Sequence, residues 1–139
     1  MKTVLVIDDD PDIRELVAWK LGQAGFAVLA EGDGESGLAA ARGRAGDRPS
    51  VHPDLVLVDW MMPKLSGIEV CRALREDPAT ADIPVILLTA KAQESELERG
   101  RAAGADDCIV KPFSPREMLK RVEALLARTS SDPPPLPHA

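Results

Sequence analysis

Five short apolar segments alternate with amphipathic segments along almost the whole chain. Because the apolar segments contain few polar residues, they are typical of parallel strands that are buried on both faces. The segments between them place apolar residues at helical spacing. This order predicts a doubly wound α/β fold, in which five helices cover the two faces of one parallel sheet. The predicted strands are residues 3–7, 26–30, 54–59, 84–89 and 108–110.

Capping residues mark the starts of the first and last predicted helices. Asp10 precedes Pro11, the preferred order of an N-cap residue and a first-turn proline, so we assign Asp10 to capping. That helix is expected to end near Gly22. Residues 114–117 (Ser-Pro-Arg-Glu) combine a capping-box pattern with a first-turn proline, so the last helix is expected to begin there.

The length of 139 residues is that of one domain with a substantial core, and we assign residues 1–128 to it. Residues 129–139 contain four prolines and are expected to form a disordered tail or the start of a linker. Residues 42–53 form a longer polar connection than most loops between a helix and a strand.

Charge and hydropathy exclude several classes of protein. The net charge of −6 argues against direct nucleic-acid binding. No apolar run approaches the roughly 20 residues of a membrane helix, and the first strand begins too early to leave room for a signal peptide. Cys71 and Cys108 form no CxxC motif, so a reducing compartment is the default. We therefore expect a cytoplasmic protein that does not bind membranes.

Polar residues stand at the ends of four predicted strands. Asp8 and Asp9 follow the first strand, and Asp59 ends the third. Thr89 ends the fourth strand, and Lys111 follows the fifth. In an open parallel sheet, functional groups gather beyond the carboxyl ends of the strands. We therefore expect these side chains to lie together at the carboxyl ends of the strands.

The predicted cluster contains three carboxylates, which cannot all stay ionised without a cation. Oxygen ligands without nearby histidine or cysteine favour Mg²⁺, with Mn²⁺ as an alternative. Lys111 and Thr89 offer a positive charge and a hydroxyl donor, the groups that hold phosphoryl oxygens. One carboxylate is then left as a nucleophile that forms an acyl phosphate. Asp59 is the natural choice, because it stands alone on the central strand.

Four sequence blocks occur together in one order. They are VIDDDP at residues 6–11, DWMMPKLSG at 59–67, LLTA at 87–90 and GADDCIVKPF at 104–113. Over roughly residues 2–128, the chain resembles the receiver domains of two-component response regulators. The resemblance implies a flavodoxin-like fold, with the five strands in the order 2-1-3-4-5.

The resemblance also implies a role for each acidic residue of the predicted cluster. Asp59 would be the phosphoacceptor and a metal ligand. Asp9 would bind Mg²⁺ directly, and Asp8 would act through a metal-bound water. The backbone carbonyl of Met61 would be the remaining protein ligand.

The remaining site residues carry over from the resemblance in the same way. Thr89 would be the switch hydroxyl that moves onto the phosphoryl group, followed by Ala90 and Lys91 in the loop after the fourth strand. Lys111 would pair with the phosphoryl group. The bond between Lys111 and Pro112 resembles the cis peptide of the family.

A signalling function follows from this resemblance. The domain would accept a phosphoryl group from a histidine kinase, a phosphotransfer protein or a small phosphodonor. It would catalyse this transfer and its own dephosphorylation without being an enzyme in the usual sense. Phosphorylation would change the face made by the fourth helix, the fifth strand and the fifth helix, and so control a partner or output domain.

That face has features of its own. The helix expected around residues 92–103 carries only Leu97 as a large apolar residue, so it should shift easily. Cys108 replaces the usual aromatic ring of the family, and we expect coupling through Thr89 and the loop after the fourth strand instead. Leu97, Glu98 and Arg101 do not fit the dimer pattern of the transcription-factor subclass, so we expect a monomer or a weak dimer.

Three other functions are alternatives to the switch. The first is the N-terminal part of a longer DNA-binding or enzymatic regulator, rather than a stand-alone receiver. The others are an adaptor with a degenerate site and an aspartyl-phosphate phosphatase. The phosphatase would need an aspartate at the position of Met61.

The sequence also contains a pattern that is typical of nucleotide-binding proteins. Residues 32–37 fit G-x-G-x-x-G, with Asp54 about 20 residues further on. These glycines follow the second strand, which would lie at the sheet edge, and Asp54 begins a strand instead of ending one. A turn with Asp33 as a helix cap explains the same residues.

Overall fold

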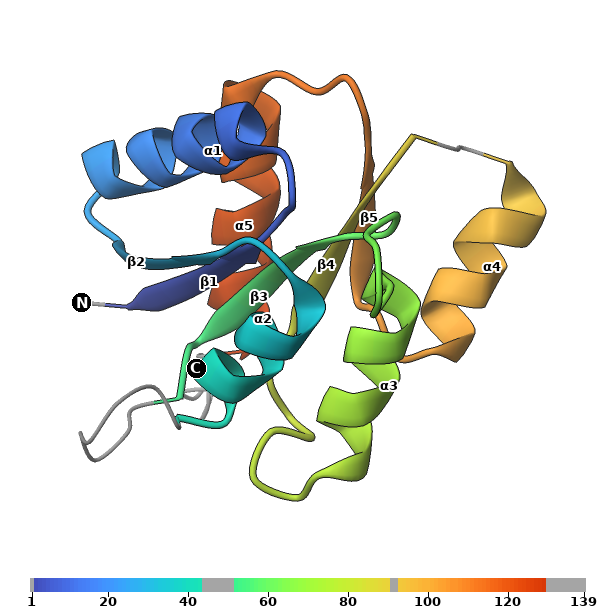
Figure 1. The fold of residues 1–139 in the computed structure, drawn as a ribbon. Helices are drawn as coiled ribbons and strands as arrows, with labels where there is room; N and C mark the ends of the chain where they lie inside the picture. Colours follow the sequence, from blue (N-terminus) through green and yellow to red (C-terminus); the bar gives the residue numbers. More distant parts are fainter. Residues whose placement is uncertain (1, 44–51, 91–92, 130–139) are drawn as a thin grey trace, which may run out of the picture.

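The computed structural model describes residues 2–43, 52–90 and 93–129, which form a five-stranded parallel sheet between two layers of helices (Figure 1). The strands lie in the order β2-β1-β3-β4-β5, so the predicted order is confirmed. The observed bounds differ from the predicted ones by at most one residue at either end. The strands are β1 (Thr3–Ile7), β2 (Ala27–Glu31), β3 (Leu55–Asp59), β4 (Val85–Thr89) and β5 (Asp107–Val110).

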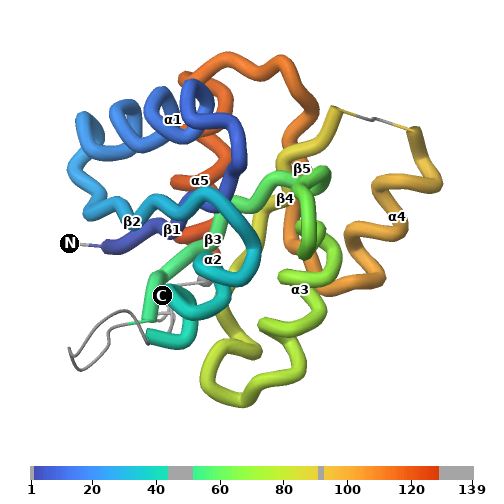
Figure 2. The backbone as a smooth tube through the Cα atoms, viewed as in Figure 1, coloured from blue at the N-terminus to red at the C-terminus, as the bar shows by residue number. Residues whose placement is uncertain are grey.

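Five helices alternate with the strands and divide between the two faces of the sheet. Helices α1 and α5 cover one face, and α2, α3 and α4 lie on the other (Figures 1 and 2). None of the helices in the described part of the chain is long and apolar enough to span a membrane. The helices are α1 (Pro11–Gln23), α2 (Gly34–Ala41), α3 (Gly67–Glu76), α4 (Glu94–Ala102) and α5 (Pro115–Thr129).

The core consists of aliphatic side chains that alternate between the two faces of the central strands. β3 and β4 are buried along their whole length, and β1 is buried from Val4 onward. Leu5, Ile7 and Leu87 face α2, α3 and α4, whereas Val4, Leu57 and Leu88 face α1 and α5. Burial on both faces explains why these strands are continuous apolar runs.

The helix boundaries agree with the capping signals. The Asp10 carboxylate accepts a hydrogen bond of 2.9 Å from Asp12 N, and Pro11 begins α1. Ser114 Oγ accepts one of 2.9 Å from Glu117 N at the start of α5. Helix α5 extends to Thr129, one residue past the predicted domain boundary. Most of the predicted tail (130–139) and of the polar connection (44–51) lies outside the described residues.

The glycine-rich stretch after β2 is a turn and a helix start. The Asp33 carboxylate accepts a hydrogen bond of 2.8 Å from Ser36 N and caps α2. The Asp54 carboxylate accepts a hydrogen bond of 2.7 Å from Thr3 N at the amino ends of β1 and β3. Asp54 therefore lies at the amino ends of the strands, whereas a dinucleotide would bind at their carboxyl ends.

Arg75 near the end of α3 joins three segments at the amino ends of β4 and β5. Its guanidinium donates hydrogen bonds to the carbonyl oxygens of Ala81, Ile83 and Gly104 and to the Asp106 carboxylate, at 2.6 to 3.1 Å. The Asp106 carboxylate also accepts a bond of 2.9 Å from Val85 N. One side chain thus satisfies main-chain acceptors that have no strand partner.

Replacing Arg75 with alanine should destabilise the domain by about 2–4 kcal/mol, because several half-buried acceptors would lose a charged donor together. Urea denaturation measures this loss. Arg72→Ala, which removes an exposed arginine from the same helix, serves as the control and should change the stability by less than about 0.5 kcal/mol. Equal losses in the two variants would contradict the bridging role of Arg75.

Two glycine-to-alanine substitutions should have opposite effects. A Cβ on Gly37 would overlap the side chain of Ile7, which is fully buried, so Gly37→Ala should cost about 1–3 kcal/mol of stability. A Cβ on Gly22 in α1 meets no atom within 4 Å. Gly22→Ala should therefore stabilise the domain by up to about 1 kcal/mol through helix propensity. Thermal unfolding of both variants tests the signs, and destabilisation of both would contradict this packing argument.

Candidate functional site

The predicted site residues meet at the carboxyl ends of the strands. Asp8 directly follows β1, Asp59 is the last residue of β3, and Thr89 is the last residue of β4. Lys111 directly follows β5. Since β1, β3, β4 and β5 are neighbours in the sheet and run parallel, their carboxyl ends bring these residues together.

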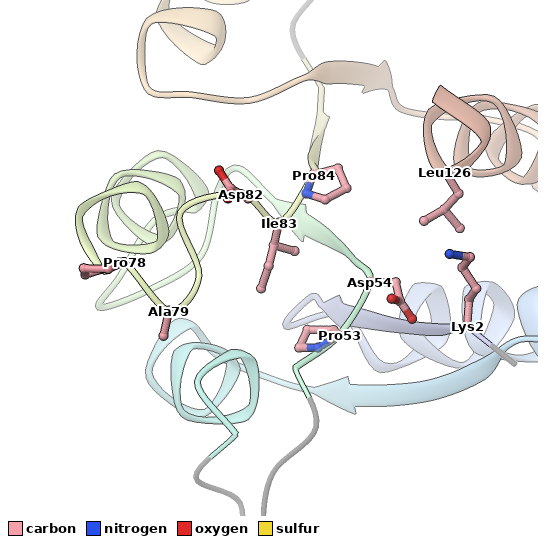
Figure 3. Close-up of a pocket in the computed structure, with 9 residues that line it drawn as sticks. All are labelled: Lys2, Pro53, Asp54, Pro78, Ala79, Asp82, Ile83, Pro84 and Leu126. Atoms are coloured by element: carbon pink, nitrogen blue, oxygen red, sulfur yellow. The ribbon is translucent and has the colours of Figure 1, made fainter. Parts of the chain in front are cut away.

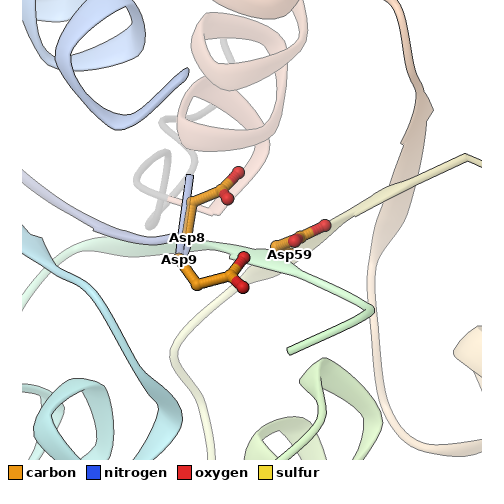
Figure 4. A group of neighbouring side chains, drawn as sticks. All are labelled: Asp8, Asp9 and Asp59. Carbon is orange, nitrogen blue, oxygen red and sulfur yellow. The ribbon is translucent and has the colours of Figure 1, made fainter. Parts of the chain in front are cut away.

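Three carboxylates form the centre of this site (Figure 4). Asp8, Asp9 and Asp59 each offer one carboxylate oxygen, and these oxygens all lie within 4.8 Å of one another. Asp8 is fully buried and Asp59 is buried, whereas Asp9 is exposed. The cluster therefore has two acids on its buried side and one at the surface.

Lys111 places a positive charge beside two of these acids. Its Nζ lies 3.0 Å from Asp59 Oδ1 and 3.3 Å from Asp8 Oδ2. Its backbone N donates a hydrogen bond of 2.7 Å to the Thr89 carbonyl, which fixes the end of β5 against β4. The Lys111–Pro112 peptide bond is cis, as the resemblance implies.

The electrostatics of the site are unbalanced toward negative charge. Burial raises the pKa of Asp59 from 3.8 to about 6; the charges of Asp8 and Asp9 add to this effect, and Lys111 opposes it. Burial disfavours the charged form of Lys111, but hydrogen bonds and charges from Asp59 and Asp8 outweigh it and raise its pKa. Among the described residues, the Lys111 ammonium pairs with two of the three carboxylates, which leaves room for further positive charge.

The donor set fits a hard divalent cation. All three side chains offer carboxylate oxygens, and no histidine or cysteine belongs to the group. Oxygen donors around an open, exposed side are suited to Mg²⁺ or Mn²⁺, which keep several water ligands. Asp8, Asp9 and Asp59 are therefore the described residues that could hold such an ion.

The other predicted site residues vary in how far the structure describes them. Thr89 is buried at the end of β4, and Ala90 next to it is exposed. The Met61 side chain is 67% exposed, and the role of its carbonyl stays a prediction. Lys91 lies outside the described residues.

Two residues beside the site had no assigned role in the sequence. Trp60, which follows Asp59, is buried, and the Arg99 guanidinium of α4 lies 5.7 Å from its ring centre. Arg14 of α1 donates a hydrogen bond of 2.7 Å to the carbonyl oxygen of Asp8. The position of Trp60 next to Asp59 was a usable signal, but no sequence pattern indicates the contact of Arg14.

Helix α4 comes close to the sheet at Gly100. Within α4, all of whose residues the structure describes, only Gly100 is buried. A Cβ on Gly100 would come within 3.0 Å of Leu87 Cδ1 and 3.3 Å of Cys108 Sγ. The small side chain of Cys108 thus suits the close approach of α4. Leu97, the large apolar residue of this helix, is half-buried, and the easy shift of the helix stays a prediction.

A separate pocket lies at the amino ends of the strands, away from the acidic cluster (Figure 3). It is lined by residues that precede β1, β3 and β4, among them Lys2, Asp54 and Pro84, and by Leu126 of α5. None of the predicted site residues lines it.

Comparison with known proteins agrees with this geometry. The family model described as response regulator receiver domain matches residues 4–123. The phosphate regulon transcriptional regulatory protein PhoB of Pseudomonas aeruginosa is 45% identical over 128 residues, which cover 92% of this chain and 53% of that protein. The DNA-binding dual master transcriptional regulator RpaA of Synechocystis is 45% identical over 139 residues, which cover 100% of this chain and 55% of that protein. The chain thus spans about half the length of these relatives.

A solved structure of chemotaxis protein CheY4 from Vibrio cholerae shares the fold. The two structures align with a TM-score of 0.80 and 32% identity, over 89% of this chain and 98% of the other. The sheet order, the acidic cluster and the matched family model lead to the same conclusion. This chain belongs to the receiver domain family of two-component response regulators.

Proposed function

We propose that the chain is a phosphorylation-activated switch in which Asp59 is the phosphoacceptor. The observation that carries the proposal is the position of the Asp59 carboxylate. It lies 3.0 Å from Lys111 Nζ, within a group of three carboxylates whose oxygens lie within 4.8 Å of one another. Asp8 and Asp9 are the proposed acidic pair, and the Met61 carbonyl is a proposed further ligand of Mg²⁺ or Mn²⁺.

In the proposed reaction, an Asp59 oxygen forms a bond to the phosphorus of a phosphohistidine, and the phosphorus–nitrogen bond breaks. The electron pair of that bond stays with the imidazole, which takes up a proton. Lys111 and the Thr89 hydroxyl stabilise the charge on the phosphoryl oxygens. A divalent cation, when bound, neutralises part of the charge of the acids and of the phosphoryl group. Hydrolysis of the acyl phosphate later restores the Asp59 carboxylate.

The proposed output is a change in the face made by α4, β5 and α5. Thr89 ends the strand that precedes α4, and α4 itself buries only Gly100, which favours displacement of this helix. We propose that coupling runs through Thr89 and the segment after β4, since Cys108 has no ring to rotate.

The proposed partners are a histidine kinase or a phosphotransfer protein upstream and a target or output domain downstream. PhoB and RpaA are named as transcriptional regulators and are about twice as long as the matched region. Their length supports the alternative that this receiver works as the front part of a longer regulator, with a linker after α5. The cytoplasmic location stays a prediction.

The proposed assembly state is a monomer or a weak dimer. On the β5–α5 side, Arg121 is paired within the chain with Asp107 at 3.0 Å and with Glu117 at 3.2 Å. These charges therefore have partners before any second copy binds.

Incubation with Mg²⁺ and acetyl phosphate, followed by intact-mass measurement, tests the phosphoacceptor. The wild-type protein should gain the mass of one phosphoryl group. Asp59→Asn should gain none, because the amide is not a nucleophile for this reaction. Asp54→Asn, which changes an aspartate at the amino ends of the strands, is the matched control and should be phosphorylated normally.

Other results of this experiment distinguish the alternatives. No adduct on the wild-type protein would support the adaptor with a degenerate site. Rapid turnover of phosphate esters would support the phosphatase. An adduct that persists in Asp59→Asn would exclude Asp59 as the phosphoacceptor.

The stability of the metal-free protein should depend on pH through Asp59. Burial raises the pKa of Asp59 to about 6, so the folded state binds its proton more tightly than the unfolded state. The resulting stabilisation is fully present below about pH 4 and is lost as pH rises through about 6. Asp59→Asn should therefore match the wild type near pH 4 and be more stable by about 1–3 kcal/mol at pH 7.

Urea denaturation in the presence of a chelator, at several pH values, measures this difference. Adding Mg²⁺ at pH 7 should reduce it, since a bound cation favours the ionised wild-type site. A difference that does not vary between pH 4 and pH 7 would contradict the raised pKa.

A further inference from the structure

Arg14 is tied to the main chain of the acidic pair. Its Nη1 donates a hydrogen bond of 2.7 Å to the carbonyl oxygen of Asp8. That carbonyl belongs to the peptide unit that joins Asp8 to Asp9. A hydrogen bond from a guanidinium is charge-assisted and stronger than one between neutral groups. Arg14 therefore restrains the rotation of the peptide from which the Asp9 side chain projects.

Asp8 and Asp9 are held in very different ways. The buried Asp8 carboxylate accepts a hydrogen bond of 2.9 Å from Asp10 N and pairs with Lys111. The Asp9 side chain is exposed, and no residue of the described ranges 2–43, 52–90 and 93–129 donates a hydrogen bond to its carboxylate. The direction in which the Asp9 side chain leaves the main chain is therefore set by its backbone, and Arg14 holds the peptide unit that precedes it.

The β2–α2 turn provides the space for the Arg14 guanidinium. A Cβ on Gly32 would come within 3.0 Å of Arg14 Nη1 and 3.6 Å of its Cζ. Asp8 N donates a hydrogen bond of 3.1 Å to the Glu31 carbonyl, which keeps this turn beside the acidic pair. A side chain larger than that of glycine at position 32 would press on the guanidinium and disturb its contact with Asp8.

We propose that Arg14 is a positioning residue for the divalent cation: it orients the Asp8–Asp9 peptide so that the Asp9 carboxylate points toward those of Asp8 and Asp59. The inference rests on the proposed function of these acids as a cation site. Arg14 does not touch the cation and acts through the main chain of the ligands. Gly32 serves the same purpose, because it has no side chain that would press on the guanidinium.

Positioning and charge predict opposite effects on cation binding. The Arg14 guanidinium is positive and repels a divalent cation, so if charge alone mattered its removal would strengthen binding. If Arg14 orients Asp9, its removal weakens binding despite the gain in electrostatic attraction. A purely structural role would lower the unfolding temperature and leave cation binding by the folded protein unchanged.

Mn²⁺ binding, measured by the loss of the electron paramagnetic resonance signal of free Mn²⁺, separates these roles without relying on phosphorylation. Arg14→Gln removes the charge and the contact. Gly32→Ala keeps the Arg14 charge but presses on the guanidinium, which must shift by a few tenths of an ångström. Lys20→Gln removes a positive charge from the same helix, away from the acidic pair, and Gly22→Ala adds a Cβ where no atom lies within 4 Å. Thermal unfolding of each variant confirms that it is folded at the temperature of the titration.

Arg14→Gln should weaken Mn²⁺ binding about 10-fold, the usual scale for a group that orients a metal ligand. Gly32→Ala should weaken it in the same direction, and the two control variants should bind as the wild type does. Tighter binding by Arg14→Gln, or unchanged binding by both Arg14→Gln and Gly32→Ala, would overturn the inference. Failure of the wild-type protein to bind Mn²⁺ would instead contradict the proposed cation site itself.

Discussion

Parallel pairing of the strands in a fixed register is the constraint on which the site depends. Ile7 pairs with Val58, Asp59 with Leu88, and Thr89 with Val110, so each of these strands ends within one residue of its neighbour. In a strand, neighbouring side chains point to opposite faces, and a slip of one residue would turn every side chain to the wrong side. The aliphatic core, which fixes the register, therefore positions the charged cluster as firmly as any contact within the cluster.

The cluster itself opposes folding, because three acids converge and two of them, Asp8 and Asp59, are buried. Lys111 offsets part of this repulsion. Because Lys111 follows β5, the last strand brings a positive charge to the acids at the ends of β1 and β3. The residual excess of negative charge is typical of a site whose ligand completes the structure. The strands and the side-chain caps of α1, α2, α3 and α5 agree with the sequence pattern, so the local conflict at the cluster is itself a mark of function.

The sequence was sufficient to predict the fold class and the acidic cluster, because both depend on patterns that repeat along the chain, whereas the strand order followed from the resemblance to receiver domains. Apolar runs indicated the strands, and the polar residue at each strand end followed from parallel topology. Contacts that reach from a side chain to a distant carbonyl carry no such pattern. Arg14 and Arg75 look like ordinary charged residues of amphipathic helices, and only the folded chain brings Asp8 and Gly104 within their reach.

Trp60 gives this domain a built-in optical probe. The chain contains two tryptophans and no tyrosine, so its ultraviolet emission arises from Trp19 and Trp60. Trp19 is 61% exposed on α1, whereas the Trp60 ring is buried beneath the Arg99 guanidinium, one residue after Asp59. A soluble quencher reaches the first indole and is excluded from the second, which makes the two signals separable. Events at the acidic cluster can therefore be followed by fluorescence in the unlabelled protein.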